Sequence, residues 1–216
     1  MITIEPELVL KAYAVGIFPM SEARDDERIF WVDPDTRTIF PLDAFHLPRR
    51  LRRTYRSGRF DIQVNQQFAN VIRACAAPDR GKAGTWINHG IEGLFTELHQ
   101  MGFAHSVEVS EGGKLVGGLY GLAIGGAFFG ESMFSIARDA SKIALVHLAG
   151  RLIIGGFALL DAQFMTEHLR QFGAREISRE DYQSRLANAI DQSAAFDSAG
   201  ADFSTDAVLQ SITQIS

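Results

Sequence analysis

Residues 104–133 read AHSVEVSEGGKLVGGLYGLAIGGAFFGESM, and this stretch decides the fold class. Residues 104–109 alternate between apolar and polar side chains, and Glu111-Gly112-Gly113 follows as a turn. Two apolar runs come next, at 115–122 and 127–133. Alternation and short apolar runs bounded by glycine turns are typical of successive β-strands. This part of the chain therefore predicts three strands in succession.

The sequence predicts helices both before and after these three strands along the chain. A first helix is expected from Pro6, which suits a first helical turn, to Val15, with Gly16 as its C-cap. Gly16 to Met20 is expected to be an apolar turn. Further helices are expected at residues 48–56, 67–76, 91–101, 140–154, 166–172, 179–191 and 206–212, and further strands at 28–32, 37–40, 60–64, 157–160 and 174–177. This order predicts an α/β (α+β) protein with a mixed sheet covered by helices, and it resembles the acetyltransferase-like (GNAT-type) fold.

The pattern of elements divides the chain into three parts. Residues 1–40 are expected to form a small N-terminal α+β domain, whose two short strands are joined through Asp33-Pro34-Asp35 and which is too small to hold a core alone. Residues 41–192 are expected to form the GNAT-like mixed-sheet domain. Residues 193–216 are rich in Ser and Ala and carry no Lys or Arg, so we expect a partly disordered tail with one closing helix.

Composition narrows the class of protein. Of the 216 residues, 46% are hydrophobic and 22% charged, as is ordinary for a soluble globular protein. The longest apolar runs are broken well before the roughly 18 residues that a membrane span needs. The chain start lacks a basic region followed by an apolar one, and a single cysteine, Cys75, excludes an internal disulfide. We therefore expect a cytoplasmic protein that does not enter a membrane, and a monomer.

The basic residues are concentrated in one place, although the net charge is −5. Six of the 21 basic residues, all arginine, lie between positions 49 and 59. On a helix, Arg49, Arg53 and Arg56 fall within roughly 60° of one another, while Leu51 and Tyr55 point away and can dock the helix. The cluster is either a solvated helix face or a phosphate-binding surface, and arginine favours bidentate phosphate contacts.

Glycine and a carboxylate mark the end of the second apolar run. The glycines at 117, 118, 121, 125, 126 and 130 match neither a Walker loop nor a dinucleotide fingerprint, so they serve either tight packing or close approach of a ligand. Glu131 at the end of an apolar strand is costly to bury alone, so we expect it to be paired or functional. Ser132 suggests a nucleophile elbow, but Phe134 replaces the required last glycine, and the match fails.

Asp161 and Gln163 follow a further apolar strand, at a place where functional side chains gather in open α/β sheets. Two positions apart, they would share one side of an extended chain, and the carboxylate could orient the amide by a hydrogen bond. Asp161 could instead cap a helix. Trp86 is either a core anchor or a stacking platform for a base. The six histidines show no metal-binding spacing, so we expect no metal.

Together these segments resemble the leucyl/phenylalanyl-tRNA protein transferase family. The resemblance covers residues 8–185 and rests on an ordered set of motifs: Ala12-Tyr13, Gly16-Ile17-Phe18-Pro19, Trp31 with Asp33-Pro34 and Arg37, Thr85-Trp86-Ile87, His105-Ser106-Val107-Glu108, Leu115 to Gly121, Gly130 to Ser135, Ala140-Ser141-Lys142 and Asp161-Ala162-Gln163. It implies a cytoplasmic enzyme that moves Leu or Phe, and to a lesser extent Met, from aminoacyl-tRNA to proteins beginning with Arg or Lys. The product would enter the N-degron pathway. No cofactor and no DNA would be involved.

The resemblance also implies roles for single residues. Asp161, Gln163 and Glu131 would be catalytic, although Glu131 could instead pair with the acceptor's basic side chain. The amino-acid pocket and the site for the terminal adenosine would be formed by Tyr13, Trp86, Leu119, Phe128, Ser132, Met133 and Leu148. The arginines at 49, 53 and 56 would bind the tRNA acceptor stem.

Four departures from the family pattern bear on substrate affinity. A leading segment that many members carry is absent before the first helix. Met20 stands where Trp is frequent, Phe95 where Tyr is frequent, and Ile136 where Arg is frequent.

Two other classes of protein share part of this pattern. A coenzyme A-dependent acetyltransferase would need a pyrophosphate loop before the helix at Ala140, and Ile136-Ala137-Arg138-Asp139 is not that loop. A non-catalytic RNA-binding module would explain the arginines, but not Glu131, Asp161 and Gln163 after apolar strands.

Overall fold

The structure, a computed structural model, describes residues 4–77, 84–198 and 200–214. Its helices are α1 (Pro6–Ala14), η1 (Leu42–Ala44, a 3-10 helix), α2 (Arg49–Arg56), α3 (Phe68–Ala76), α4 (His89–Gln100), α5 (Ala140–Ile154), α6 (Glu167–Arg170), α7 (Arg179–Ile190) and α8 (Thr205–Thr213). Its strands are β1 (Phe18–Met20), β2 (Phe30–Val32), β3 (Thr36–Phe40), β4 (Asp61–Val64), β5 (Ala104–Glu111), β6 (Lys114–Ile124), β7 (Ala127–Ser135), β8 (Leu159–Gln163) and β9 (Arg175–Ser178).

The three strands expected in the middle of the chain form the centre of the sheet. β5, β6 and β7 run antiparallel in sequence order. The turns that join them use Gly112, Gly113 and Gly125, all with positive φ, a conformation that glycine adopts without steric cost. Gly125 is also closely packed, because a Cβ there would come within 2.1 Å of the Ile190 carbonyl oxygen. Gly125 therefore serves a turn and tight packing, one of the two alternatives that the sequence left open for the glycine-rich segment.

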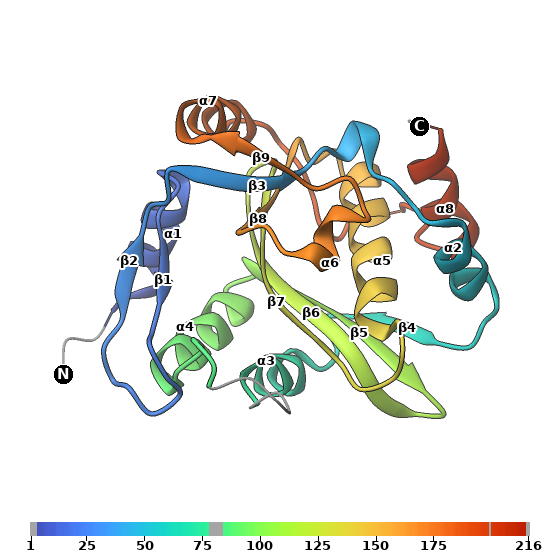
Figure 1. The fold of residues 1–216 in the computed structure, drawn as a ribbon, viewed down its shortest axis with the longest axis horizontal. Coiled ribbons are helices and arrows are strands. Elements are labelled where there is room, and N and C mark those ends of the chain that lie inside the picture. Colours follow the sequence, from blue (N-terminus) through green and yellow to red (C-terminus); the bar gives the residue numbers. More distant parts are fainter. Residues whose placement is uncertain (1–3, 78–83, 199, 215–216) are drawn as a thin grey trace.

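The large sheet has seven strands in the order β4-β5-β6-β7-β8-β3-β9. All neighbours are antiparallel except β7 and β8, which are parallel and joined through α5. The sheet is therefore mixed, and helices lie before and after its central strands (Figure 1). The expected α/β class is confirmed.

Helices cover both faces of the sheet and create two hydrophobic cores. On one face, α5 packs on β5, β6 and β7, with α2 and α8 against it (Figure 1). On the other face, α3 and α4 pack on the same strands, while α1 and α7 extend this layer toward β3 and β8. Alternation along a strand divides its residues between the cores: Phe128 belongs to the first and Phe129 to the second.

The N-terminal region differs from the expectation in two ways. Residues 18–20 form β1, which pairs antiparallel with β2, and are not only a turn. Pro19 is tolerated there because a two-stranded sheet consists of edge strands only. β3, in contrast, does not pair with β2, since it lies in the large sheet between β8 and β9. The chain therefore crosses from the small sheet to the large one between residues 32 and 36.

The expected strand at 157–160 is displaced by two residues. β8 begins at Leu159 and ends at Gln163, so Asp161 and Gln163 lie within the strand. Phe157 still closes the end of α5 through a hydrogen bond from its N–H to the Leu152 carbonyl. The apolar run was the right signal, but it begins in the segment between α5 and β8 and ends inside the strand.

The closing helix expected near 206–212 is confirmed as α8. Val208, Leu209 and Ile212 are buried against the α5 side, where Gly150 allows α8 to come close. Arg151 of α5 bonds the Phe196 carbonyl and the Asp197 carboxylate, and so holds the preceding segment. No helix in the described ranges combines the length and apolar character that a membrane span requires.

Candidate active site

The candidate site lies where β7 and β8 part. The two strands pair only from Ala127–Leu159 to Phe129–Asp161, and both then continue. At the same point β7 has a bulge against β6, because Gly130 pairs with Gly121 and Ser132 with Tyr120, leaving Glu131 as the extra residue. An extra bulge residue is left unpaired and its side chain is re-aimed. The bulge therefore turns Glu131 toward the end of β8.

Asp161 is fully buried and bonded on both of its oxygens. The Nε of Arg37 donates to Oδ1 at 3.0 Å, and its Nη2 donates to Oδ2 at 2.6 Å. The hydroxyl of Tyr182 donates to Oδ2 at 3.0 Å. The side chains of Arg37 and Asp161 are 1% and 0% exposed, so each charge depends on the other for compensation. Asp161 does not cap a helix, since the N-cap of α6 is Thr166.

Arg37 also ties α1 to the sheet. Its Nη1 donates to the carbonyl of Gly16 at 2.7 Å, just after the end of α1. Its guanidinium lies over the rings of Phe18 and Tyr182, at 4.6 and 4.4 Å from their centroids. Gly16 has a φ of +86°, and a Cβ there would collide with Gln183 of α7. Arg37 therefore fixes the position of the helix that carries Tyr13.

Gln163 adopts an unusual backbone conformation at the end of β8. Its φ is +53°, in the left-handed region that residues other than glycine rarely adopt. Its N–H donates to Asp161 Oδ1 at 2.8 Å, while its side-chain Nε2 donates to Glu131 Oε1 at 3.4 Å. We expected the Asp161 carboxylate to orient the Gln163 amide directly. The contact is instead to the backbone N–H, so the carboxylate fixes the backbone and the side chain is free to reach Glu131.

Glu131 is the group that connects α1, β7 and β8. Its Oε1 accepts hydrogen bonds from the Tyr13 hydroxyl at 2.8 Å and from Gln163. Burial is the largest cause that raises the pKa of the Glu131 carboxyl; the Tyr13 hydrogen bond and Arg37 oppose the rise, the Asp161 charge adds to it, and the pKa is about 8 in all. A carboxyl with this pKa exchanges its proton near neutral pH.

The residues expected to bind the amino acid separate into two groups. Leu119, Phe128 and Leu148 are buried in the α5-side core, and Met133 packs against it partly buried. Ser132 lies on the opposite side, next to the Cys75 thiol. The structure thus brings four of the five together and places Ser132 across the strand from them.

Trp86 and the three unusual residues occupy different positions around this site. Trp86 is partly buried against the second core, and its carbonyl accepts a hydrogen bond from Ser21 at 2.8 Å. Phe95 is buried beside Tyr13 and Tyr120. Met20 packs partly buried against the same core, and Ile136 is 75% exposed just after β7. Only Ile136 presents its side chain to solvent.

The arginine helix forms as expected, but its members differ in their partners. Leu51 and Tyr55 dock α2. Arg50 forms a bidentate pair with Asp139, and Arg59, just beyond the helix, forms one with Glu111. Arg56 lies 3.9 Å from Asp206, which is almost fully exposed. Within residues 4–77, 84–198 and 200–214, Arg49 and Arg53 form no ion pair, and both are exposed.

The sequence assigned no role to Arg37 or Tyr182, which are the partners of Asp161. Arg37 was noted only as part of a motif. Its place at the start of an expected short strand did not indicate that its side chain would be buried. Tyr182 is the first buried position of α7, which the helix pattern alone could indicate. In the described part of the chain, no group of three or more His, Cys, Asp or Glu side chains could hold a metal ion.

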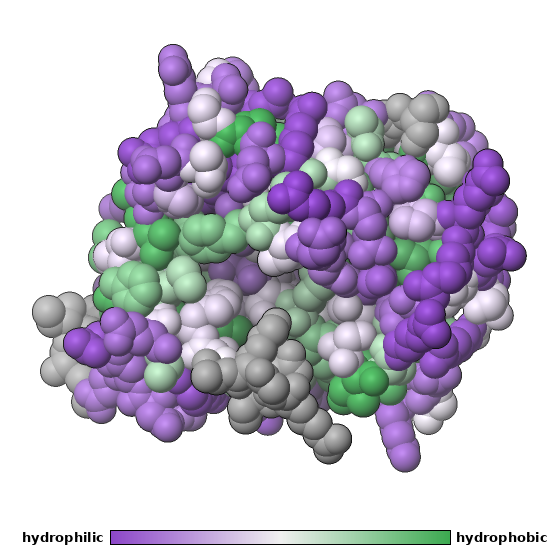
Figure 2. Space-filling view, in the orientation of Figure 1, coloured by the Kyte–Doolittle hydropathy of each residue, from purple (hydrophilic) through white to green (hydrophobic). Residues whose placement is uncertain are grey.

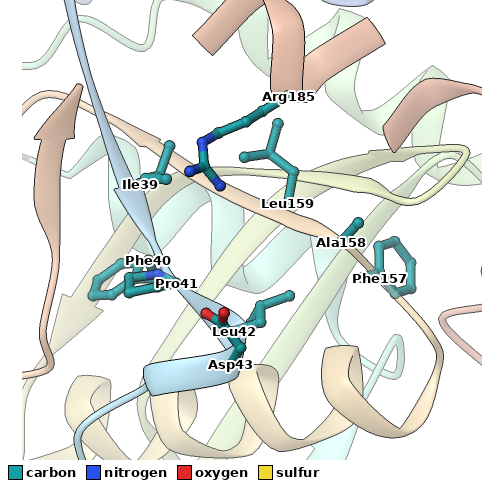
Figure 3. Close-up of a pocket in the computed structure, with 9 residues that line it drawn as sticks. All are labelled: Ile39, Phe40, Pro41, Leu42, Asp43, Phe157, Ala158, Leu159 and Arg185. Atoms are coloured by element: carbon teal, nitrogen blue, oxygen red, sulfur yellow. The ribbon is translucent and has the colours of Figure 1, made fainter. Parts of the chain in front are cut away.

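The surface is hollowed where these elements meet. Figure 2 shows a hollow near the centre of this face, with hydrophobic surface along one side of it. In Figure 1 the same area lies between the end of β8, β7 and α4. A separate pocket of about 230 Å³ is lined by Ile39, Leu42, Leu159 and neighbouring residues, with Arg185 reaching over it (Figure 3). That pocket contains none of the expected site residues.

Known proteins place the chain among the aminoacyltransferases. It belongs to the leucyl/phenylalanyl-tRNA protein transferase family: the family model of that description matches residues 39–187, and the model of its N-terminal domain matches residues 3–35. The enzyme of that name from Phenylobacterium zucineum is 57% identical over 96% of both chains. The one from Paramagnetospirillum magneticum is 60% identical over 88% of this chain and 91% of its own.

Solved structures add a weaker likeness. The structure of L-PGS from Bacillus licheniformis aligns with 78% of this chain and 56% of its own, at 13% identity and a TM-score of 0.43. That score is too low to define a shared fold family, so the acetyltransferase-like topology stays a prediction. The family membership rests on the sequence relatives.

Proposed function

We propose that the chain transfers leucine or phenylalanine, and less efficiently methionine, from aminoacyl-tRNA to the N-terminal α-amine of proteins that begin with Arg or Lys. The new peptide bond would mark the acceptor for the N-degron pathway. The observation that supports this most directly is the hydrogen-bonded set of Tyr13, Glu131 and Gln163 beside the buried Asp161, in a chain of this family. We further propose that the enzyme acts as a cytoplasmic monomer.

The proposed chemistry needs no covalent intermediate, since the aminoacyl ester is already activated. The acceptor's neutral α-amine attacks the ester carbonyl, a C–N bond forms, and the bond from the carbonyl carbon to the ribose oxygen breaks. One proton leaves the amine and ends on the released ribose hydroxyl. The enzyme's main task is to hold amine and ester in line, which is worth several kcal/mol of the barrier.

Each site residue has a part in this proposal. The amide oxygen of Gln163 accepts a hydrogen bond from the attacking amine, while its NH2 group remains hydrogen-bonded to Glu131. Glu131 accepts the amine proton and passes it to the leaving oxygen, a role suited to a carboxyl whose pKa is raised to about 8. Backbone N–H groups around Glu131 stabilise the developing oxyanion. Asp161 positions Gln163 through its backbone.

The donor is held at two further places in this proposal. Leu119, Phe128, Met133 and Leu148 surround the leucine or phenylalanine side chain, and Trp86 packs on the terminal adenosine with Tyr13 nearby. An apolar pocket separates side chains that differ by one methylene by only about 1–3 kcal/mol, so some methionine transfer is expected. Arg49, Arg53 and Arg56 contact phosphates of the acceptor stem.

The test is transfer of labelled leucine from Leu-tRNA to a reporter protein beginning with Arg, compared with the same reporter beginning with Met. Labelling of the Arg form alone supports both the reaction and the acceptor rule. Equal labelling of both forms would contradict the acceptor rule. Labelling of neither, with Leu-tRNA still bound, would contradict the reaction.

A further inference from the structure

One edge of β7 is left open inside the sheet. On the β6 side, β7 is paired along its whole length, from Ala127 to Ser135. On the β8 side, pairing stops at Phe129, six residues before the strand ends. Among the strand pairings and the turn, loop and cap hydrogen bonds of residues 4–77, 84–198 and 200–214, none joins the backbone of residues 131–135 to a segment other than β6.

The open edge is also accessible. Residues 127–129 are fully buried, whereas residues 130–134 are partly exposed and Ser135 is exposed. A Cβ on Gly130 would meet only the Asp161 carbonyl oxygen, at 3.4 Å. Strand β7 borders the hollow of Figure 2. Unpaired N–H and C=O groups along an accessible strand form a template for another extended chain.

The position of the edge indicates which chain it fits. Its inner end is Glu131 and Gln163, which point into the gap where β7 and β8 part. The edge then runs outward for the rest of β7 to the exposed Ser135. An extended peptide on this edge would have one terminus at the reacting groups and the other leading to solvent.

We propose that the acceptor protein's N-terminal segment docks as an added strand on the free edge of β7, residues 130–135, with its α-amine at the Glu131–Gln163 end. The proposal rests on the proposed transfer reaction, and it explains how one site can take many acceptors. Strand addition uses main-chain hydrogen bonds, which are independent of side-chain identity, so only the first residue needs to be read. A nucleic-acid backbone has no N–H donors at strand spacing and does not fit this edge.

Strand addition predicts an alternating pattern along the acceptor. In an added strand, the N–H groups of successive residues point alternately toward the neighbouring strand and away from it. We would measure leucine transfer to a set of peptides that begin with Arg and carry one backbone N-methyl group at position 2, 3, 4, 5 or 6. Matched peptides would carry an ester in place of the same amide, which removes the donor without adding bulk.

Alternate positions should lose transfer efficiency (kcat/KM) by about three- to tenfold, the loss of one hydrogen bond, while the positions between them stay within about twofold. The ester series should lose efficiency at the same positions as the methyl series. Uniform tolerance at all five positions, or an equal loss at all five, would overturn the docking mode while the unmodified peptide still reacts. No labelling of the unmodified Arg peptide, with the Arg reporter protein reacting, would overturn the docking of a short N-terminal segment. No labelling of either would overturn the transfer reaction itself.

Discussion

Two groups of arginine in this protein are used in opposite ways. Arg37 is 1% exposed and directs its donor groups to fixed partners: the Asp161 carboxylate and the Gly16 carbonyl. Arg49 and Arg53 on α2 are exposed and, across the ranges that the structure describes, form no ion pair. A buried, fully bonded guanidinium sets geometry, whereas an exposed and unpaired one offers charge to a partner. The two groups should therefore fail differently when changed.

The largest effect is expected from breaking the buried pair. Replacing Arg37 by Met leaves the Asp161 charge buried without compensation, so the free energy of unfolding should fall by about 3–5 kcal/mol. Denaturant unfolding measures this change. The matched control is Arg59→Met, which breaks the exposed pair with Glu111 and should lower stability far less, because solvent screens this pair. Equal losses in the two variants would contradict the proposed difference between the groups.

A more conservative substitution of Arg37 separates the effect on the geometry of the site from the effect on folding. Arg37→Lys keeps the charge but cannot bond Asp161 in a bidentate manner and reach Gly16 at the same time. The folded enzyme should bind tRNA normally, yet its kcat for transfer should drop by on the order of 10²-fold, because Gln163 and Tyr13 lose their fixed positions. A normal kcat with a raised KM would show that Arg37 does not position the reacting groups. Asp161→Ala should likewise lower transfer while tRNA binding survives.

A substitution of Gln163 should change the stability and the transfer activity in opposite directions. Its left-handed backbone costs about 1 kcal/mol for a residue with a Cβ, a cost that glycine avoids. Gln163→Gly should therefore be as stable as the parent or slightly more stable, while transfer falls by about 10²–10³-fold because the amide is lost. Unfolding and single-turnover transfer measure the two effects. A variant that kept its transfer rate would remove Gln163 from the proposed chemistry.

Glu131 should make stability and activity depend on pH. Its pKa is raised from 4.5 to about 8 on folding, so the stabilisation is fully present below pH 4.5 and is lost as the pH rises toward 8. Glu131→Gln should match the parent near pH 5 and be more stable than the parent at pH 8. Its kcat should be lower and should lose the rise that the parent shows between pH 6 and 8. Parallel stability curves over this range would contradict the raised pKa.

The smallest effect on the protein itself is expected at α2. Arg49→Gln and Arg53→Gln remove no ion pair from the described structure, so stability should change by no more than about 0.5 kcal/mol. The affinity for tRNA should fall, and the slope of its salt dependence should decrease by about 0.7–0.9 for each phosphate that is no longer neutralised. Arg59→Gln, which changes an arginine of the same sequence cluster that is paired with Glu111, serves as the control. An unchanged slope would exclude this face as the tRNA surface.

Local sequence patterns predicted most of the helices and strands. The alternation at 104–109 and the glycine turns predicted β5 to β7, and the helix at 140–154 has the bounds that were expected. Errors occurred where local signals overlapped. The apolar run at 157–160 includes two residues of the connection from α5 and the start of β8, and Gly16 to Met20 has a turn glycine before a short strand. The pairing of β3 with β8 and β9 has no local signal, because it joins segments more than 100 residues apart.

The sequence by itself determined most of the elements that form, which family the motifs resemble, and which side chains carry reactive groups. It did so because periodicity, turns and motif order are local properties. Only the tertiary structure decided what those groups do to one another. Arg37 meets Asp161 across 124 positions of sequence, and Tyr13 meets Glu131 across 118. Burial, which raises the pKa of Glu131, and the open edge of β7 are also products of packing, because they depend on which distant segments lie beside a strand and which do not.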